Sequence, residues 1–372
     1  MGLALLVAAV LFVAFANGAN DNFKGVATLH GSGAVSYRPA LAWATFTTLA
    51  GSLAAAWLSG GLVTRFTGKG LVDDAIVGDP AFLLAVAAGA AATVLLATRL
   101  GFPISTTHTL TGALVGAGIV MAGPGHLAYG TLGRAFAFPL LASPLVAMAL
   151  TAFLYVALRQ ARLAMGVTHE DCICVGRHVP LAALTADGRI VQVGAGPGVS
   201  VDRPERCARR YSGNVLGIGA QSALNGLHAL SAGAVGFARG LNDTPKILAI
   251  LVAAGALGVH DGTGLVAVAM AAGGILAARR VAHTMAHGIT GMNHGQGFAA
   301  NLVTAALVAV ASPLGLPVST THVSCGALFG IGAVNGEARW RVIGQVHLAW
   351  VTTLPAAVLL AASFALLTSA VL

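Results

Sequence analysis

The stretch FANGANDNFK, residues 15–24, recurs in the second half of the chain as FARGLNDTPK, residues 237–246. A second phrase, GFPISTTH at residues 101–108, recurs as GLPVSTTH at residues 315–322. The two phrases keep their order, which indicates that a whole unit is duplicated. In a membrane chain, duplicated halves with Gly- and Pro-interrupted segments at matching places are typical of secondary transporters.

The composition indicates a polytopic α-helical membrane protein. Of the 372 residues, 57% are hydrophobic and 9% are charged, whereas soluble domains carry about 25% charged residues. Several long tracts contain no Asp, Glu, Lys or Arg, and the tract at 281–336 is long enough for more than one membrane helix of roughly 20 residues. We expect spans at residues 2–16, 38–60, 81–98, 104–122, 135–158, 214–238, 246–259, 263–279, 286–312, 318–335 and 343–370.

A polar insert separates the two halves. We expect a first transmembrane repeat at residues 1–162, the insert at 163–210 and a second transmembrane repeat at 211–372. Eight of the 20 basic residues lie between positions 159 and 210, and positive residues favour the cytoplasmic side. We therefore place the insert in the cytoplasm and the repeats in the cytoplasmic (inner) membrane. The net charge of +8 then reflects topology rather than nucleic-acid binding.

The insert is expected to be a small, partly β appendage, because the run at 189–193 resembles a strand and turn signals flank it. It contains Cys172, Cys174 and Cys207. A Cys-x-Cys spacing without a second close pair falls short of a zinc-finger pattern. Reduced thiols are therefore the expectation, with a metal site as the alternative.

The phrase Pro-x-Ser-Thr-Thr-His predicts a helix N-terminus. Pro fits the first helical turn, and hydroxyls there accept hydrogen bonds from free backbone N–H groups. Such an end offers donors and a positive dipole to an anion. In the alternative interpretation these hydroxyls only pack helices together, and the duplication behind a Pro break argues against it. The candidate substrate ligands are Ser105, Thr106, Thr107, Ser319, Thr320 and Thr321.

The phrase Asn-Asp-x-x-Lys places ionisable residues in apolar surroundings. Such residues are costly in a membrane and indicate a functional site by default. On a helix, Asp21 shares a face with Lys24, as Asp243 does with Lys246, so each pair can offset its own charge. An ion pair at a loop edge without any ligand is the alternative.

With these phrases the chain resembles the inorganic phosphate transporter (PiT) family of cation-coupled phosphate permeases, over both halves outside the insert. The resemblance implies an all-α polytopic fold of two inverted-topology repeats with broken, re-entrant helical hairpins. It also implies a central site where phosphate meets sodium or protons, with no other cofactor and no bound metal cofactor. By motif match, Asn20, Asp21, Asn242 and Asp243 lie at the substrate and coupling-ion site, and the six hydroxyl residues line it from the hairpin tips.

The chain departs from the family pattern in both copies. The family usually continues Gly-Ala-Asn-Asp-Val-Ala-Asn, and here Lys24 and Lys246 replace the last Asn; the second copy also has Leu241 and Pro245. An Asn carbonyl can ligate sodium, whereas an ammonium group instead occupies the space of a cation and neutralises the neighbouring Asp. We hypothesise that the two lysines replace some or all of the sodium dependence, leaving proton-coupled or weakly coupled uptake.

The carboxylates favour phosphate over sulfate. Hydrogen phosphate has protons to donate, so Asp21 and Asp243 can accept from it and repel sulfate, provided that the lysines do not already occupy them. A permease for sulfate or another tetrahedral oxyanion is the alternative. His108 and His322 are candidate proton shuttles, with a neutral structural role as the equal alternative. In the tract at 281–336, His283, His287 and His294 are assigned a structural role. Asn293, Gln296 and Asn301 belong to a polar seam there, which is a candidate lining of the transport pathway.

Two other functional classes are weighed against transport. An intramembrane hydrolase needs one asymmetric nucleophilic site, and two equivalent copies argue against it, so no enzyme is expected. A passive anion channel would differ by failing to accumulate phosphate against its gradient. The expected partners are inorganic phosphate and the lipid bilayer but no nucleic acid, with a homodimer as a candidate assembly.

Overall fold

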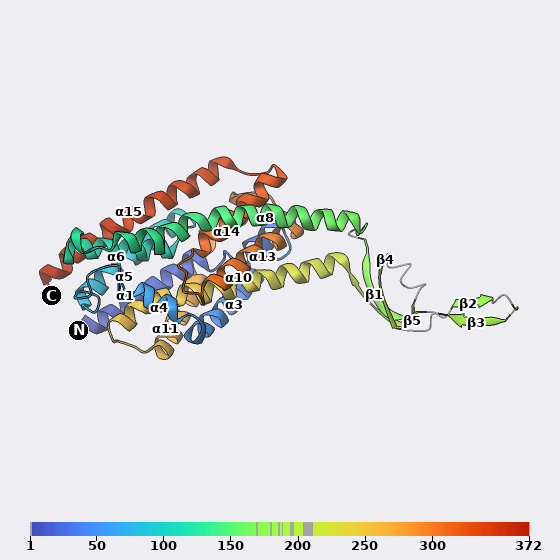
Figure 1. Cartoon of the computed structure of the whole chain (residues 1–372), viewed down its shortest axis with the longest axis horizontal. Helices are drawn as coiled ribbons and strands as arrows, with labels where there is room; N and C mark the ends of the chain where they lie inside the picture. The colour runs from blue at the N-terminus through green and yellow to red at the C-terminus, as the bar shows by residue number, and fades with distance from the viewer. Residues whose placement is uncertain are drawn as a thin grey trace. The chain divides into compact units, whose positions relative to one another are not determined.

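The computed structural model describes residues 2–168, 170–178, 181–184, 187, 189–193, 197–203 and 211–371. It divides into two compact units. One consists of Met1–Tyr155 with His228–Leu372, and the other of Val156–Leu227. The first unit is helical and contains both predicted motif pairs, and the N- and C-termini lie at the same end of it (Figure 1).

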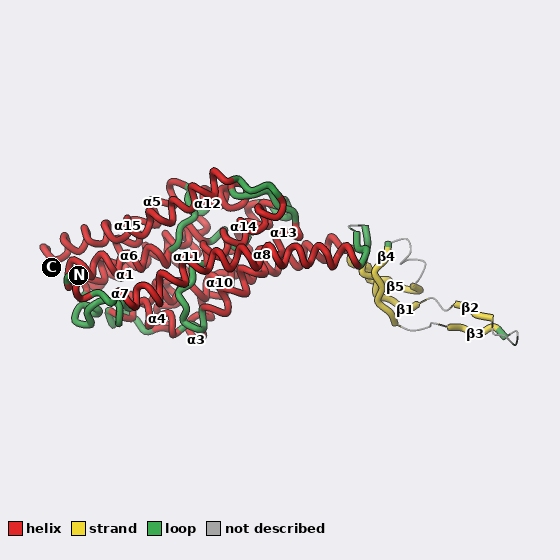
Figure 2. The backbone as a smooth tube through the Cα atoms, turned by 45° about the horizontal axis from the view of Figure 1, so that its top comes forward, coloured by secondary structure: helices red, strands yellow, loops and turns green. Residues whose placement is uncertain are grey.

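Helices dominate the described chain (Figure 2). Those that begin in the first half are α1 (Gly2–Asp21), α2 (Ala27–Gly31), α3 (Tyr37–Leu58), α4 (Gly60–Phe66), α5 (Pro80–Leu100), α6 (Thr106–Ala122), η1 (Pro124–His126), α7 (Tyr129–Thr131), η2 (Leu132–Ala137) and α8 (Phe138–Ala164). Those of the second half are α10 (Ala220–Ala253), α11 (Val259–Ala277), α12 (Arg279–His283), η3 (Thr284–Gly288), α13 (His294–Ala311), α14 (Thr320–Asn335) and α15 (Trp340–Val371).

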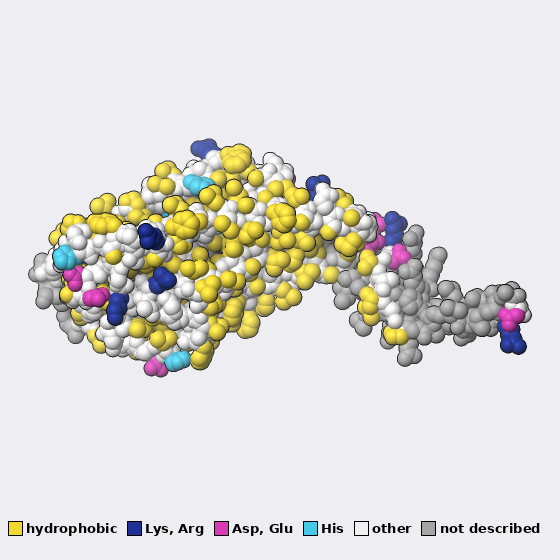
Figure 3. Space-filling view, viewed as in Figure 1, with side chains coloured by type: hydrophobic (Ala, Val, Ile, Leu, Met, Phe, Trp, Pro, Cys, Tyr) yellow, Lys and Arg dark blue, Asp and Glu magenta, His cyan; other side chains and the backbone are white. Residues whose placement is uncertain are grey.

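Seven helices within the described residues are long and apolar enough to cross a membrane. They are Gly2–Asp21, Tyr37–Leu58, Pro80–Leu100, Tyr129–Ala164, Val259–Ala277, His294–Ala311 and Trp340–Ser369. Hydrophobic side chains cover most of the visible face of the helical unit, with few charged groups among them (Figure 3). A water-soluble domain would not expose such a surface, so the prediction of a polytopic helical membrane protein is confirmed.

The second unit contains the expected β structure. Strands β1 (Cys172–His178), β4 (Pro197–Asp202) and β5 (Tyr211–Gly219) form an antiparallel sheet in the order β4-β1-β5. In its register Cys172 pairs with Asp202 on one side and with Gly219 on the other. Strands β2 (Leu181–Leu184) and β3 (Ile190–Val193) form a separate antiparallel pair, which contains most of the strand predicted at 189–193.

Four predicted spans differ from the structure. The span expected at 286–312 is interrupted, because η3 ends at Gly288 and α13 begins at His294. The first span, expected to end at residue 16, continues as α1 through the motif to Asp21. The spans expected at 214–238 and 246–259 are a single helix, α10, which passes through Pro245. Proline removes one helical hydrogen bond, a loss that membrane helices tolerate where neighbouring groups compensate. Residues 211–219 belong to strand β5 and not to a span.

The two predicted helix breaks are present and build two hairpins. In the first, α5 ends at Leu100 and is capped by Gly101, whose φ of 77° is in the left-handed region, and α6 begins at Thr106. In the second, Gly315 with φ 67° lies between α13 and α14. Glycine adopts this backbone conformation without a Cβ clash. Both hairpins therefore reverse direction immediately before the Ser-Thr-Thr-His runs.

Close helix packing positions the first motif against the second. Helix α1 packs on α5 and α11, while α15 packs on α5 and α6. A Cβ atom at Gly18 of α1 would lie 1.9 Å from the carbonyl oxygen of Met270 in α11, and one at Gly51 of α3 would lie 1.9 Å from that of Phe237 in α10. Only glycine permits these backbone approaches, as is common between membrane helices.

Candidate functional site

The two motifs and the two hairpin tips converge on one buried site. All twelve residues predicted for substrate or ion binding are 2% exposed or less. They are Asn20, Asp21, Lys24, Ser105, Thr106, Thr107, Asn242, Asp243, Lys246, Ser319, Thr320 and Thr321. Hydrogen bonds connect residues of all four segments, and in this conformation the twelve residues have almost no access to solvent.

The hairpin tips present two equivalent helix N-termini. Ser105 caps α6 by accepting a hydrogen bond from the backbone N–H of His108 at 3.1 Å, and Ser319 caps α14 by accepting from that of His322 at 3.2 Å. The cap residues have almost the same φ and ψ, −97° and 117° for Ser105 and −100° and 118° for Ser319. The N-cap prediction is therefore correct in both copies, and each cap leaves the positive end of its helix within the site.

The two tips are also bonded to each other. The hydroxyl of Thr321 donates to the carbonyl of Ile104 at 2.7 Å, and the hydroxyl of Thr107 donates to the carbonyl of Val318 at 3.3 Å. Ile104 and Val318 occupy equivalent positions in the duplicated phrase, as do Thr107 and Thr321. Each hairpin therefore donates the equivalent threonine-to-carbonyl hydrogen bond to the other hairpin.

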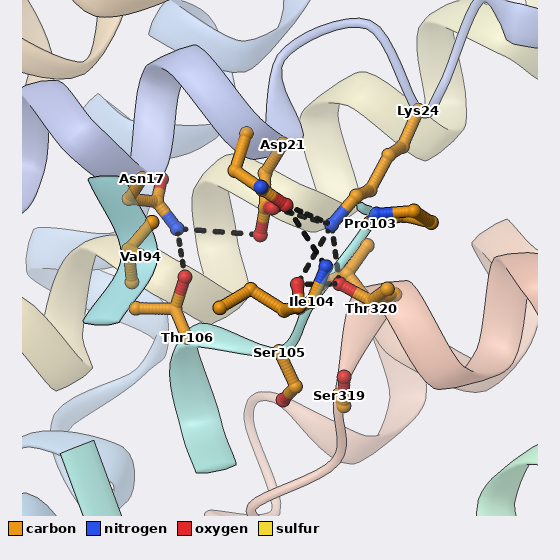
Figure 4. Close-up of polar contacts among 12 residues, drawn as sticks. Asn17, Asp21, Lys24, Val94, Pro103, Ile104, Ser105, Thr106, Ser319 and Thr320 are labelled. Carbon is orange, nitrogen blue, oxygen red and sulfur yellow. Dashed lines mark hydrogen bonds and ion pairs between the residues drawn. The ribbon is translucent and has the colours of Figure 1, made fainter. Parts of the chain in front are cut away.

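The first motif places Lys24 at the contact between the two hairpin tips. Lys24 Nζ donates to the carboxylate of Asp21, to Asn20 Oδ1 at 3.1 Å and to the carbonyl of Ile104 at 2.9 Å. It also donates to the Thr321 hydroxyl. Figure 4 shows the Lys24 ammonium group directed at Asp21 and Ile104, beside the hairpin tips that carry Ser105 and Ser319. The i, i+3 pairing of Asp21 with Lys24 is present as predicted.

Asn20 ties the same motif to the first hairpin. Its Nδ2 donates to the Thr98 hydroxyl at 2.9 Å and to the Phe102 carbonyl at 3.0 Å. Its Oδ1 accepts from the backbone N–H of Ile104 at 3.1 Å as well as from Lys24. Every polar atom of the Asn20 side chain is thus engaged by the protein, and in this conformation Asn20 serves to hold the hairpin turn.

The second motif repeats much of this arrangement from the middle of α10. Lys246 Nζ donates to the Thr107 hydroxyl at 2.7 Å and to the Val318 carbonyl at 2.8 Å, and lies 3.6 Å from Asp243 Oδ1. Asn242 Nδ2 donates to Asp243, to the Val318 carbonyl and to the Thr320 hydroxyl at 3.1, 3.2 and 3.1 Å. Each lysine therefore contacts the carbonyl of its own half's hairpin and the hydroxyl of the other.

Two residues that the sequence analysis did not select complete the site. Asn17 Nδ2 donates to the Thr106 hydroxyl at 2.8 Å and lies 3.4 Å from Asp21 Oδ2 and 3.3 Å from Asp243 Oδ2, so it bridges the two motifs. Arg239 is fully buried, donates to Asn17 Oδ1 and places its Nε 3.6 Å from Asp243 Oδ2. The two residues occupy the same position of the duplicated motif. An ionisable residue at membrane depth indicates a functional site by default. Applied to Arg239, this rule would have identified it from the sequence.

The buried charges do not cancel. Lys24, Arg239 and Lys246 face the carboxylates of Asp21 and Asp243. Three formal positive charges and two negative charges leave an excess of +1 within this group. Buried charges are stable only when they are paired or bind a counter-ion. An anion entering between the helix N-termini of α6 and α14 would supply that missing negative charge.

The two candidate proton shuttles, His108 and His322, are neighbours in the first turns of α6 and α14. The rings of His108 and His322 are 4.4 Å apart, centroid to centroid. His322 Nδ1 is 3.0 Å from the Leu140 carbonyl, while His108 Nδ1 and His322 Nε2 are buried without a hydrogen-bond partner in the structure. Both rings line an apolar cavity of about 810 Å³ between α6, α8, α14 and α15. The histidines thus follow directly after the hydroxyl runs in sequence, and both line this apolar cavity.

The polar seam has mainly structural contacts. Asn293 and Gln296 form a capping box at the start of α13, and Asn301 Nδ2 donates to the Thr28 hydroxyl at 2.8 Å. His294 lies near His228, with ring centroids 6.2 Å apart. His287 lies in a cluster with His30 and His283, at centroid distances of 5.1 and 5.7 Å.

The insert cysteines do not form a metal centre in the described part of the chain. Within those residues no group of three or more His, Cys, Asp or Glu side chains has the arrangement of a metal site. Cys174 is disulfide-bonded, so the expectation of reduced thiols throughout the insert is wrong for this residue. Cys207 lies outside the described residues.

The known proteins to which this chain is similar are phosphate transporters. The model of the "Phosphate transporter family" matches residues 17–361. A "Probable low-affinity inorganic phosphate transporter" of Rhizobium meliloti is 30% identical over 370 residues, which cover 96% of this chain and 93% of that protein. A solved structure entitled "The sodium-dependent phosphate transporter" superimposes with a TM-score of 0.76 over 100% of both chains, at 19% identity. That last likeness concerns the fold alone.

Proposed function

Since the chain belongs to the phosphate transporter family, whose model matches residues 17–361, we propose that it is a secondary active transporter for inorganic phosphate. It takes phosphate up across the cytoplasmic membrane, coupled to protons and/or sodium, and it is not an enzyme. The observation that carries this proposal is the meeting of two capped helix N-termini, α6 and α14, with the charged groups of both motifs in one buried site.

The proposed substrate site lies between the hairpin tips. The hydroxyls of Ser105, Thr106, Thr107, Ser319, Thr320 and Thr321 and the N-termini of α6 and α14 supply the donors that replace the hydration shell of the anion. The amides of Asn20 and Asn242 hold the tips. Phosphate binding requires that the bonds between Thr107 and Val318 and between Thr321 and Ile104 open, so entry of the anion is linked to separation of the two hairpins.

Phosphate is favoured over other oxyanions by the carboxylates. Hydrogen phosphate carries about −1.5 to −2 charges near neutral pH and retains a proton to donate. Asp21 and Asp243 can accept that proton in a hydrogen bond, whereas sulfate has none to offer. Sulfate remains the second candidate, because Lys24 already contacts Asp21 and Lys246 lies 3.6 Å from Asp243. Both lysines attract any tetrahedral dianion.

His108 and His322 are proposed as the route by which a proton reaches or leaves the site. Imidazole is the side chain whose unperturbed titration lies closest to neutral pH. The two rings are in contact, and each has a ring nitrogen without a hydrogen-bond partner in the structure. Replacing both by glutamine should weaken the dependence of uptake on an imposed proton gradient. An unchanged proton dependence would assign them a structural role.

Reconstituted uptake tests the proposed function. Purified full-length protein in proteoliposomes should accumulate labelled phosphate against its gradient, and arsenate should compete better than sulfate or molybdate. Asp21→Asn and Asp243→Asn should each abolish accumulation, because both halves build one site. Asp261→Asn, a matched change of an exposed aspartate in α11, should not. Flux that only equilibrates phosphate would indicate a channel, and stronger competition by sulfate would indicate a sulfate permease.

The proposal also covers the side of the membrane on which the insert lies and the oligomeric state. The eight basic residues in and just before the insert, between positions 159 and 210, favour a cytoplasmic insert, and a homodimer is a candidate assembly in the bilayer. A cysteine introduced at exposed Arg203 should be labelled by a membrane-impermeant maleimide only after the cells are opened. Labelling in intact cells would place the insert outside.

A further inference from the structure

Building on the proposed function, we infer that Lys24 and Lys246 are resident cations: their ammonium groups fill the two oxygen-lined positions that a mobile sodium ion would need, so phosphate transport by this chain does not depend on sodium. The chain has three lysines, at positions 24, 69 and 246. Two of them are buried in the site, at 2% exposure for Lys24 and 0% for Lys246.

The first cage consists only of oxygen atoms. Lys24 Nζ contacts the Asp21 carboxylate, Asn20 Oδ1, the Ile104 carbonyl and the Thr321 hydroxyl. Carboxylate, amide, carbonyl and hydroxyl oxygens are the ligands that hard cations prefer. The ammonium group supplies three donors and one positive charge to them, and therefore satisfies the same oxygens that a monovalent metal ion would coordinate.

The second cage repeats the first across the duplication. Lys246 Nζ donates to the Thr107 hydroxyl at 2.7 Å and to the Val318 carbonyl at 2.8 Å, with Asp243 Oδ1 at 3.6 Å. The hydroxyl, the carbonyl and the carboxylate are the counterparts of those around Lys24 in the duplicated phrases. One isolated buried lysine could be accidental, but an equivalent hydroxyl, carbonyl and carboxylate around both lysines indicate a built feature of the site, although the second cage lacks the counterpart of Asn20 Oδ1, because Asn242 Oδ1 accepts from Ser312.

A sodium ion cannot share either cage with its ammonium group. Two positive charges a few ångströms apart repel strongly in a buried site, where screening by water is weak. Arg239, with its Nε 3.6 Å from Asp243 Oδ2, adds a third fixed positive charge. The carboxylates are therefore already compensated without any metal ion.

Each ammonium group is covalently attached to the chain, and this attachment decides whether it can act as a coupling ion. A coupling ion drives transport because it binds on one side of the membrane and dissociates on the other. The ammonium groups neutralise Asp21 and Asp243 but remain attached to the chain through the whole cycle. A sodium gradient therefore contributes no driving force through these positions, and the proton gradient is left as the coupled one.

The test compares Lys24→Asn with Lys246→Asn, singly and together, against wild type and against Lys69→Asn. Lys69 is exposed, so its change is the matched control. Thermal unfolding of the full-length protein in detergent is measured in sodium and in potassium chloride at equal ionic strength, without phosphate. Sodium should stabilise the double variant selectively and leave wild type and Lys69→Asn unchanged, because only the emptied cages bind the ion.

Phosphate uptake supplies the second readout. Replacing external sodium by potassium should leave wild-type uptake unchanged. In the double variant sodium should raise the apparent phosphate affinity roughly 5- to 150-fold, the range typical of two coupled ligand sites. If the double variant does not fold, each single variant has one emptied cage and is compared in the same way.

Two outcomes would overturn the inference. One is a wild-type protein that sodium selectively stabilises or stimulates, and the other is an emptied cage that gains no response to sodium. A wild type that transports no phosphate in any medium would instead reject the proposed function, while the sodium-dependent stability of the variants would still decide whether the lysines replace the ion.

Discussion

Replacing Arg239 by methionine should destabilise the helical unit by about 3 kcal/mol, the lower end of the range for breaking a buried ion pair. Arg239 is fully buried, and its Nε lies 3.6 Å from Asp243 Oδ2. At that separation two unit charges attract by about 4–5 kcal/mol for an effective dielectric constant of ~20. Lys246, also 3.6 Å from the same carboxylate, keeps part of this compensation, and the methionine side chain preserves the packing of the aliphatic stem.

A double-mutant cycle isolates the pair. Unfolding in detergent would be followed for Arg239→Met, Asp243→Asn and the combined variant. The double variant should be less destabilised than the sum of the two single changes by about 1–3 kcal/mol, because each single change removes a partner that the remaining charge has in the wild type. Arg65→Met, the same change at an exposed position of α4, should stay within about 0.5 kcal/mol of wild type. Strict additivity of the two buried changes would refute the assigned pairing.

Three further predictions follow from the same contacts. Ser105→Ala and Ser319→Ala should each lower the free energy of unfolding by about 1 kcal/mol through loss of a helix cap, and thermal unfolding that is unchanged in both would contradict the capping assignment. Gly51→Ala should destabilise the protein by about 1–3 kcal/mol, because its methyl group would lie 1.9 Å from a carbonyl oxygen of α10; Gly264→Ala, with open space around its Cβ, is the matched control and should unfold like wild type. Asn17→Ala should reduce kcat/KM for phosphate uptake by roughly 10- to 150-fold, the equivalent of about 1.5–3 kcal/mol for lost hydrogen bonds to charged groups. Asn225→Ala, the same change at a partly exposed position outside the site, is the control, and an effect of Asn17→Ala no larger than that of the control would remove Asn17 from the site.

Much of the site could be predicted because its signals are local. The caps at Ser105 and Ser319 follow from a hydroxyl residue placed before an Ala- and Gly-rich helix, and their geometry needs only neighbouring backbone groups. The pairing of Asp21 with Lys24 follows from the spacing of side chains on one helix. The glycines at 101 and 315 mark turns because their conformation is local as well.

Other parts of the site depended on packing between distant segments. Nothing local in the sequence indicates that Asn17 contacts Asp243, 226 positions away, or that Arg239 contacts Asn17, 222 positions away. The predicted break between the spans at 214–238 and 246–259 was wrong for a related reason, since surrounding helices stabilise α10 across Pro245, a residue that would end an isolated helix. The strand at 211–219 was mistaken for the start of a span because short apolar runs fit either structure.

The sequence alone determined the membrane-protein class, the duplication, the two hairpin breaks and the residue types that meet an anion, because hydrophobic length, turn chemistry and helix capping act over a few residues. Only the tertiary structure decided which oxygens surround each lysine. The Thr321 hydroxyl reaches the Ile104 carbonyl across 217 positions of sequence, and Lys246 reaches Thr107 across 139. Such contacts arise when whole helices pack, and that packing converted two local Asp–Lys pairs into one shared site with an excess positive charge.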